Sequence, residues 1–238
     1  MFIWGAIMLE ISDLCLKYGQ SQILYDVNLT ADVGKITTVM GNNGMGKTSL
    51  LKAIAGRHPF VSGTLKIDGQ VLTAPSAHEA ARAGIAYVPQ GREVFPMMTV
   101  AENLETGFAC LPTSDRFVPD MIYDLFPVLK DMRSRRGGDL SGGQQQQLAI
   151  ARALITKPKV LLLDEPTEGI QPNVIQQIGD ALSNLRSESN LAIVLVEQNA
   201  DFAYRIADAI AIMSRGAVVS QADRKDLTKA ALLEHLAL

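Results

Sequence analysis

The sequence predicts an α/β fold that carries a helical insertion, and three observations support this prediction. A short apolar strand over residues 36–40 runs directly into a glycine-rich loop and a helix. The second half of the chain alternates strands and helices, which is typical of an α/β core. Between the two halves, four prolines divide residues 91–138 into short segments that interrupt this pattern.

The first fifty-odd residues predict two long strands, a central strand and a helix. Residues 9–18 and 23–31 alternate apolar and polar side chains, as half-buried strands do. The strand over 36–40 leads into the loop. The helix that follows, over 47–55, is expected to end at Gly56, because glycine is favoured directly after a helix.

A hairpin and a further strand precede the insertion. Asp68 and Gly69 separate two short apolar runs, and this dipeptide favours a tight turn between antiparallel strands. The apolar run 85–88 predicts a buried strand that Pro89 ends. Within the insertion, helices are expected over 100–108 and 120–125.

The second half of the chain predicts two helices and two buried strands. A helix is expected over 144–155 and another over 172–186, with a proline in its first turn. The runs 160–163 and 191–196 are continuously apolar, as strands of a parallel sheet are when both faces are covered. A length of 238 residues fits one large domain.

Composition excludes several classes of function. With 47% hydrophobic and 20% charged residues the chain is globular, and its net charge of −3 argues against a nucleic-acid groove, which needs a basic face. The four basic residues of the segment 130–136 are expected to be a solvated helix end or loop. They are Lys130, Arg133, Arg135 and Arg136.

Cysteines, histidines and apolar runs point to no metal site, disulfide or membrane span. Cys15 and Cys110 have no metal-ligand spacing and favour a reducing compartment. The three scattered histidines, His58, His78 and His235, are expected to be surface or packing residues. No apolar run approaches the roughly 18–20 residues of a membrane span. Residues 1–7 lack the features of a signal peptide, so the domain is expected to begin at Met8, with 1–7 as an extension.

The loop between strand and helix has the form G-x-x-x-x-G-K-T, which cradles phosphates. Its glycines let backbone N–H groups face the phosphates, and the helix N-terminus adds a favourable dipole. Lys47 would reach the β- and γ-phosphates, and the Thr48 hydroxyl would bind Mg²⁺. Nucleotide contacts are expected from Gly41, Asn42, Asn43, Gly44, Met45, Gly46, Lys47, Thr48 and Ser49. A glycine turn before an ordinary helix is the alternative.

Two further motifs follow in order. The segment Leu140, Ser141, Gly142, Gly143, Gln144 reads LSGGQ, and by chance it would occur in about 1 of 2,000 such chains. The apolar run 160–163 then ends in Asp164 and Glu165, where a carboxylate can hold Mg²⁺ directly or through water. Taken alone, the two acids could be an ordinary turn before a proline.

In this order, the phosphate loop, LSGGQ and the acid-ended strand resemble those of the ATP-binding cassette (ABC) ATPases. The resemblance covers nearly the whole chain from Met8. It implies a P-loop nucleotide-binding domain with a mixed sheet core, a small antiparallel β subdomain and a helical subdomain over about 91–150. It also implies ATP and Mg²⁺ as ligands. By this resemblance, Glu165 polarises the attacking water, and LSGGQ covers ATP held by a second subunit in a head-to-tail dimer.

The resemblance implies roles for three further residues. Gln90 matches the glutamine that contacts Mg²⁺ or the water, and the segment after it would sense a membrane partner. Tyr18 matches an aromatic that stacks on adenine, although an isolated tyrosine at a strand end is otherwise a packing residue. Gln198 occupies the place of the usual histidine, so it can donate a hydrogen bond to the γ-phosphate but cannot titrate. The segment 168–171 occupies the place of the loop that crosses the dimer in this family, and it lacks that loop's usual aspartate.

Within the family, the stretches 196–199 and 89–96 look like ATPases of importers for branched-chain amino acids and amides. The stretches 139–147 and 165–172 are similar to the ATP-binding subunit of urea importers. The resemblance implies an ATP-hydrolysing motor on the cytoplasmic face of a membrane. Its partners would be a second ABC ATPase (a paralogue or itself), two permease subunits and, indirectly, a solute-binding protein, with no nucleic acid.

Two other functions stay open on the sequence, and a third conflicts with it. The cargo could be branched-chain amino acids or short amides rather than urea. The chain could instead be a soluble ABC ATPase, such as one in iron–sulfur cluster assembly, and co-purification with permeases would separate these classes. A nucleotide-binding regulator without turnover is the third, and it conflicts with Glu165 and an intact LSGGQ.

Overall fold

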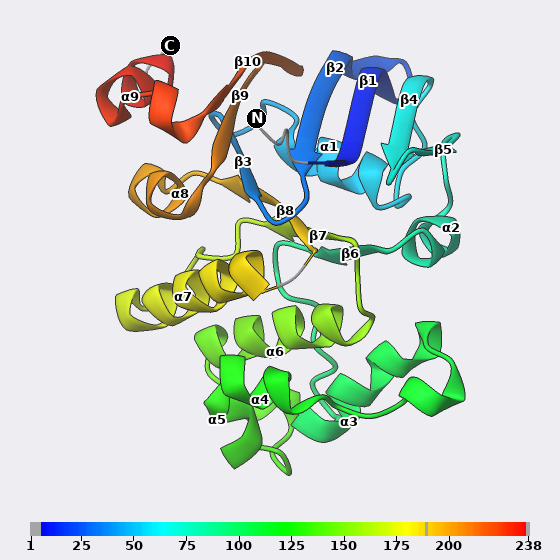
Figure 1. Cartoon of the computed structure of the whole chain (residues 1–238), viewed down its shortest axis with the longest axis vertical. Helices are drawn as coiled ribbons and strands as arrows, with labels where there is room; N and C mark the ends of the chain where they lie inside the picture. The colour runs from blue at the N-terminus through cyan, green and yellow to red at the C-terminus, as the bar shows by residue number, and fades with distance from the viewer. Residues whose placement is uncertain (1–5, 189, 237–238) are drawn as a thin grey trace.

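Two β-sheets organise the part of the chain that the computed structural model describes, residues 6–188 and 190–236 (Figure 1). The antiparallel sheet has the order β2-β1-β4-β5 and consists of β1 (Ile7–Tyr18), β2 (Ser21–Asp32), β4 (Ser62–Ile67) and β5 (Gln70–Leu72). The second sheet has the order β10-β9-β3-β8-β7-β6. Its strands are β3 (Ile36–Met40), β6 (Ile85–Val88), β7 (Val160–Asp164), β8 (Ala192–Glu197), β9 (Ala209–Ser214) and β10 (Ala217–Asp223).

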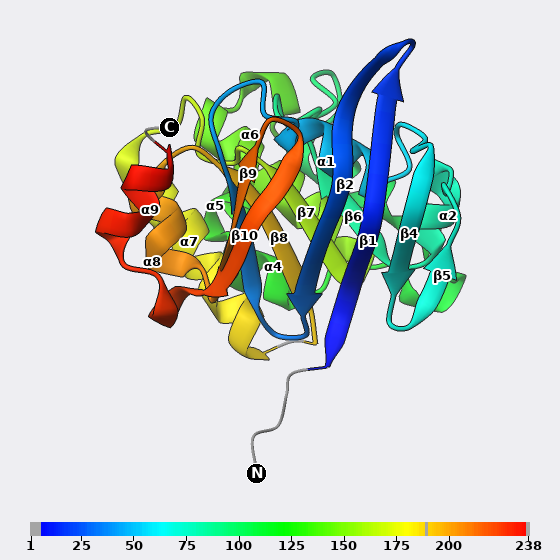
Figure 2. The same cartoon turned by 90° about the horizontal axis from the view of Figure 1, so that it is seen from above.

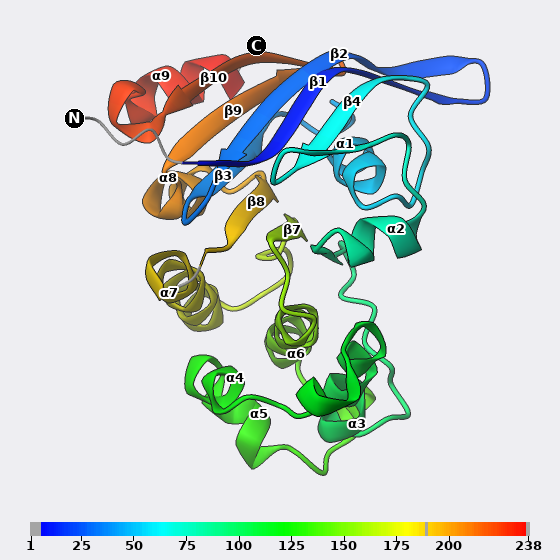
Figure 3. The ribbon, with the colours of Figure 1, turned by 45° about the vertical axis from the view of Figure 1, so that its right-hand side comes forward.

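The second sheet is parallel except at one edge, where β10 pairs antiparallel with β9. Strands β3, β7 and β8 are buried along their whole length, as the continuous apolar runs predict. Alternate residues of β7 face opposite sides: Val160 and Leu162 pack with the antiparallel sheet and α1, whereas Leu161 and Leu163 pack with the helices below. The sheet is therefore the middle layer of the molecule (Figure 3).

Helices cover the sheet and form the insertion. Helix α1 (Lys47–Ile54) packs between the two sheets, and the long helices α6 (Gly142–Ile155) and α7 (Pro172–Glu188) lie under the parallel sheet (Figures 1 and 3). The insertion packs against α6 from the far side and contains α3 (Val100–Glu105), α4 (Asp120–Leu125) and α5 (Pro127–Asp131). The remaining helices are α2 (Ala77–Arg82), α8 (Ala200–Ile206) and α9 (Lys229–Leu236).

The two sheets lie side by side at β2 and β10, as the view from above shows (Figure 2). They do not share a ladder there. Instead, the side-chain amide of Gln221 replaces a backbone group: its Nε2 donates to the Thr30 carbonyl oxygen at 2.8 Å, and its Oε1 accepts from the Thr30 N–H at 3.2 Å. One side chain thus satisfies both backbone polar groups of Thr30, a half-buried residue on an edge strand.

Several predicted elements are confirmed, and the boundaries of others were wrong for local reasons. Asp68 and Gly69 both have left-handed backbones, with φ of 52° and 76°, as a tight hairpin between β4 and β5 requires. The helix expected over 100–108 is α-helical only to Glu105, and a 3₁₀ turn continues it over Thr106–Cys110. In that turn Gly107 lies against Ile155 of α6, where a Cβ would come within 2.9 Å of the Ile155 side chain.

Six elements were not predicted from the sequence: α2, α5, α8, α9, β9 and β10. The start of α6 was predicted at Gln144, two residues late. Helix α6 begins at Gly142 because Ser141 and Gln144 form a capping box: the Ser141 N–H donates to Gln144 Oε1 at 2.9 Å, and Ser141 Oγ accepts from the Gln144 N–H at 3.4 Å. Helix α2 has the same device in Ser76 and Glu79, and this S-x-x-E signal was present in the sequence.

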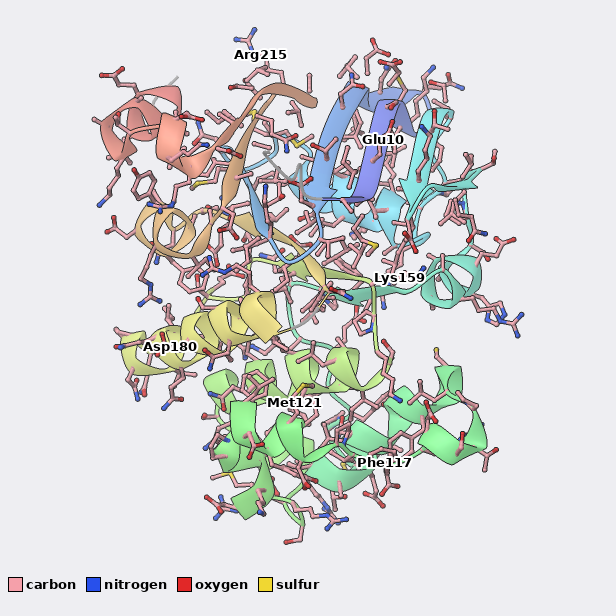
Figure 4. All side chains as sticks on the ribbon, viewed as in Figure 1. Glu10, Phe117, Met121, Lys159, Asp180 and Arg215 are labelled. Carbon is pink, nitrogen blue, oxygen red and sulfur yellow. The ribbon has the colours of Figure 1, made fainter. Side chains whose placement is uncertain are left out.

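The remaining expectations concern the surface and the ends. All four basic residues of the segment 130–136 are exposed, as expected for a solvated loop. Exposed apolar side chains also occur in the insertion, including Phe117 and Met121 (Figure 4). Among the described residues, no helix is both long and apolar enough to cross a membrane. Strand β1 begins at Ile7, one residue before the expected domain start; residues 1–5 and the His235 side chain lie outside the described part of the chain.

Candidate active site

The glycine-rich loop joins the end of β3 to the first turn of α1, as its motif predicts. Gly46, directly before the helix, has φ of 97°, a conformation that other residues rarely adopt. Gly41 passes so close to β9 that a Cβ would lie 2.2 Å from the Met213 carbonyl oxygen. The loop is also tied to the β9–β10 turn, because the Met45 carbonyl oxygen accepts from the Gly216 N–H at 3.1 Å. Two of the motif's glycines are therefore required by the backbone geometry itself.

Lys47 is the first residue of α1, and its side chain turns back into the loop. Its ammonium donates to the carbonyl oxygens of Gly41 at 2.7 Å and Asn42 at 3.0 Å, and it lies 3.9 Å from Glu165 Oε1. The side chain is only 4% exposed. Burial lowers the pKa of Lys47, and the nearby Glu165 carboxylate opposes this effect. The loop thus holds a desolvated cation in the position that phosphate oxygens would approach.

Asp164 ends β7 and is held from two sides. Thr48 Oγ1 donates to Asp164 Oδ1 at 3.1 Å, and the Tyr87 hydroxyl donates to Asp164 Oδ2 at 3.0 Å. Burial raises the pKa of Asp164, and these two hydrogen bonds partly offset the rise. Burial and the neighbouring carboxylate raise the pKa of Tyr87, so its phenol stays a donor. Tyr87 was not predicted as a site residue, because the sequence shows only that it lies on a buried strand.

Glu165 follows Asp164, and its carboxylate accepts hydrogen bonds from both predicted glutamines. Gln198 Nε2 donates to Glu165 Oε1 at 2.5 Å, and Gln90 Nε2 donates to Glu165 Oε2 at 3.3 Å. Gln90 also donates to Glu168 Oε2 at 2.9 Å. The three catalytic candidates besides Lys47 therefore meet at one carboxylate, although they come from the ends of β6, β7 and β8. Carboxyl ends of parallel strands share one sheet edge, which is where α/β folds place their ligands.

Lys47, Glu165 and both glutamines line one cleft of about 420 Å³, whereas Asp164 does not line it. Its lining consists of Tyr18, Ile23, Asn43, Gly44, Gly46, Lys47, Thr48, Ser49, Gln90, Glu165, Glu168 and Gln198. Of the predicted loop contacts, Gly41, Asn42 and Met45 do not line it. The carbonyl oxygens of Gly41 and Asn42 instead accept hydrogen bonds from Lys47. Met45 accepts from the backbone N–H groups of Arg215 and Gly216.

Tyr18 lies at the mouth of this cleft, at the end of β1. The residue is 40% exposed, and its ring meets the His58 ring edge-on, with the ring centres 4.3 Å apart. A half-exposed aromatic face beside a phosphate loop is suited to stacking on a planar base. His58 therefore acts as a packing residue, as predicted, and supports one side of Tyr18.

The LSGGQ residues do not line this cleft. They sit at the start of α6, where the Ser141 and Gln144 side chains cap the helix. The Arg92 guanidinium covers this start: a Cβ on Gly142 would lie 2.9 Å from Arg92 Nη1, and Arg92 Nη2 also donates to the Glu168 carbonyl oxygen at 3.3 Å. Within one subunit the signature therefore lies outside the cleft that the phosphate loop lines.

The electrostatics and donor types of the cleft fit a hard divalent cation. Three carboxylates, Asp164, Glu165 and Glu197, act on the single ammonium of Lys47. Among the described residues, no group of three or more His, Cys, Asp or Glu side chains could hold a metal alone. Mg²⁺ commonly binds through one or two protein oxygens together with substrate phosphates. Thr48 Oγ1 and Asp164 Oδ1 offer such a pair, and Gln90 lies at the same edge.

A Tyr87→Phe variant is expected to weaken the apparent affinity for Mg²⁺ by about 10-fold, because the loss of a hydrogen bond that orients a metal-binding carboxylate typically has this effect. The change leaves the ring in place beside Arg57, whose guanidinium carbon lies 5.2 Å from the ring centre. The measurement is the Mg²⁺ dependence of ATP hydrolysis. Tyr25→Phe is the matched control, since the Tyr25 hydroxyl donates to the Gln22 carbonyl oxygen at 3.1 Å. An equal response in both variants would contradict the expected role of Tyr87.

Comparisons with known proteins agree with this geometry. Residues 24–168 match the family model described as "ABC transporter". The high-affinity branched-chain amino acid transport ATP-binding protein BraG of Pseudomonas aeruginosa is 41% identical over 213 residues, which are 89% of this chain and 91% of BraG. The probable branched-chain amino acid transport ATP-binding protein LivF of Archaeoglobus fulgidus is 37% identical over 234 residues, 97% of this chain and 98% of LivF.

Solved structures show the same fold. The ATP-binding subunit of an ABC transporter superposes with a TM-score of 0.82 at 24% identity, covering 97% of this chain and 100% of that one. A bacterial ABC transporter cassette solved as a dimer gives a TM-score of 0.79 at 24% identity, covering 91% of this chain and 99% of that one. The predicted architecture of an α/β core with an antiparallel sheet and helical parts is therefore confirmed. The chain belongs to the ABC transporter family, as an ATP-binding subunit with ATPase activity.

Proposed function

We propose that this chain is the ATP-hydrolysing motor of a solute importer and that two such cassettes bind ATP between them. The observation that carries the proposal is the convergence of Lys47, Gln90 and Gln198 on Glu165 within one cleft. Phosphoryl transfer depends on positioning and charge neutralisation, and this cleft offers a cation, a carboxylate and amide donors at one sheet edge. A binding protein without turnover would need no carboxylate there.

In the proposed mechanism each side chain acts on a different part of the nucleotide. Tyr18 stacks on the base, and the backbone of residues 43–46 and the Lys47 ammonium bind the phosphates. Glu165 accepts a hydrogen bond from the attacking water and orients it, and Gln198 donates to the γ-phosphate. Thr48, Asp164 and Gln90 would hold Mg²⁺, which neutralises phosphate charge.

The signature completes the site only in a dimer. Ser141 and the amides of Gly142 and Gly143 lie at the N-terminus of the 14-residue helix α6, and such a terminus attracts anions. Since these residues do not line their own cleft, we propose that Leu140 to Gln144 contact the ATP held by a second cassette. That cassette is a paralogue in the cell, and a second copy of this chain can take its place in isolation. The dimeric cassette of the same fold supports this arrangement.

For the cargo, we propose urea. Support comes from the stretches 139–147 and 165–172, which resemble those of the ATP-binding subunit of urea importers. Branched-chain amino acids are the second candidate, because relatives at 41% and 37% identity are named for that cargo. The cargo would pass through two permease subunits fed by a solute-binding protein, with this chain on the cytoplasmic face of the membrane. No residue of the ATPase would touch it.

Uptake measurements in cells that lack this chain test the proposal. We expect urea uptake at low external urea to fall, leucine uptake to persist, and the intact chain but not Lys47→Ala to restore transport. The phosphate-binding ammonium is required for the motor, so a restored uptake with Lys47→Ala would contradict it. Loss of leucine uptake instead would move the cargo to branched-chain amino acids. Unchanged uptake of both solutes, with no permease co-purifying, would favour a soluble ABC ATPase such as one in cluster assembly.

A further inference from the structure

Glu197 is a buried carboxylate for which the mechanism above has no use. It ends β8 and is only 2% exposed. Burial raises its pKa, although four hydrogen-bond donors counteract this. An ionisable group at such a position is costly unless its hydrogen bonds are complete. The hydrogen-bond partners of Glu197 therefore show which segments of the chain it holds in place.

Its two oxygens serve two different loops. Glu197 Oε1 accepts from Thr167, from the hydroxyl at 2.6 Å and from the backbone N–H at 3.2 Å. Glu197 Oε2 accepts from the backbone N–H groups of Gln198 at 3.0 Å and Asn199 at 3.1 Å. One oxygen thus binds the loop that follows Glu165, and the other binds the loop that carries Gln198.

These two loops must keep a fixed separation. Gln198 Nε2 donates to Glu165 Oε1 at 2.5 Å, and the Glu165 N–H donates to the Val196 carbonyl oxygen at 2.9 Å. Glu165 also has a left-handed backbone with φ of 48°, which a residue with a Cβ adopts only when its surroundings hold it there. Thr167, two residues further on, is the nearest point at which a side chain anchors this turn to the sheet.

We propose that Glu197 is a positioning residue for hydrolysis: through Thr167 and the Gln198 backbone, its carboxylate sets the position of Glu165 relative to Gln198. A carboxylate is suited to this place because all four partners are donors. A glutamine offers one acceptor oxygen, and its NH₂ group would face two donors. The phosphate loop takes no part in these hydrogen bonds, so loss of the Thr167 hydroxyl is expected to lower turnover without weakening ATP binding. The inference rests on the role of Glu165 in the proposed function.

The test compares steady-state ATP hydrolysis of the full-length chain with that of Thr167 variants. Thr167→Val removes the hydroxyl at nearly constant shape and is expected to lower kcat about 10-fold, with KM and the Kd of ATP unchanged, because a small misplacement of a reacting group is costly. Thr167→Ser, which keeps the hydroxyl, is expected to recover most of the turnover. Thr156→Val is the matched control: its hydroxyl donates to the Ala153 carbonyl oxygen at 2.8 Å, at the far end of α6.

A double-mutant cycle separates positioning from general loss of structure. If Thr167 acts through Glu165, Thr167→Val should change the residual turnover of the Glu165→Gln chain by less than about two-fold. Glu197→Gln provides an independent variant, with an expected loss of kcat of about 100-fold. A wild-type kcat in Thr167→Val, a rise in KM alone, or an equal loss in the Glu165→Gln background would overturn the inference. Wild-type turnover in Glu165→Gln itself would instead contradict the proposed role of Glu165.

Discussion

Glu165→Gln is expected to lower ATP turnover by at least ~100-fold while ATP still binds, because the variant removes the base-like carboxylate and keeps its shape. In the structure this carboxylate accepts from Gln90 and Gln198 and lies 3.9 Å from the Lys47 ammonium. None of the backbone groups of the phosphate loop depends on it. With hydrolysis slowed, a second subunit would stay bound across the nucleotide, and we expect an ATP-dependent dimer.

Steady-state hydrolysis and size-exclusion chromatography with and without ATP check this result. Glu168→Gln is the matched control, since Glu168 accepts from the same Gln90 side chain at 2.9 Å but is exposed and lies three residues along the loop. We expect its turnover to stay much closer to that of the wild type. Equal losses in the two variants would mean that overall negative charge, and not an oriented carboxylate, drives hydrolysis.

Lys47→Ala is expected to raise the Kd for ATP by roughly 100-fold or more, because each hydrogen bond to a charged group contributes about 1.5–3 kcal/mol. The ammonium is buried and already held at the loop by two carbonyl oxygens, so little rearrangement is needed for it to reach phosphate oxygens. Without it, the negative charge of Asp164, Glu165 and Glu197 would act on the phosphates without the compensating charge of Lys47.

Direct binding of ATP to the purified chain, for example by calorimetry, measures this effect. Lys66→Ala is the control: it removes a lysine from the antiparallel sheet, where its ammonium pairs with Glu10 at 3.1 Å on a partly exposed surface. Such a surface pair contributes little, and we expect ATP binding by this variant to be unchanged. Retained binding in Lys47→Ala would show that the backbone amides suffice.

Much of the central layer could be predicted because its sequence pattern is local. Continuous apolar runs are enough to locate β3, β6 and β7, and the left-handed turn of Asp68 and Gly69 needs only the preferences of two residues. The edge strand β10 and its neighbour β9 were missed. Strand β10 is only partly buried, so its sequence pattern is weak, and it pairs with β9. Strand β9 pairs in parallel with β3, far away in the sequence.

Only part of the site could be predicted from the sequence. The phosphate loop, Asp164 and Glu165 are contiguous motifs whose spacing reflects a strand, a turn and a helix, so the chain order reveals them. Tyr87 and Glu197 gave no such signal. Tyr87 is one aromatic residue on a buried strand, and its role depends on Asp164, 77 positions later in the chain.

By itself, the sequence determined the phosphate loop, the two acids at the end of β7 and the family, because each of these depends on residues close together along the chain. Only the tertiary structure decided that Gln90 and Gln198 meet at one carboxylate, that the signature does not line its own cleft, and that Glu197 joins two loops. The physical reason is the parallel sheet. Its strands bring residues from distant segments to one edge, and the sheet order that does so is set by packing across the whole core and not by any local pattern.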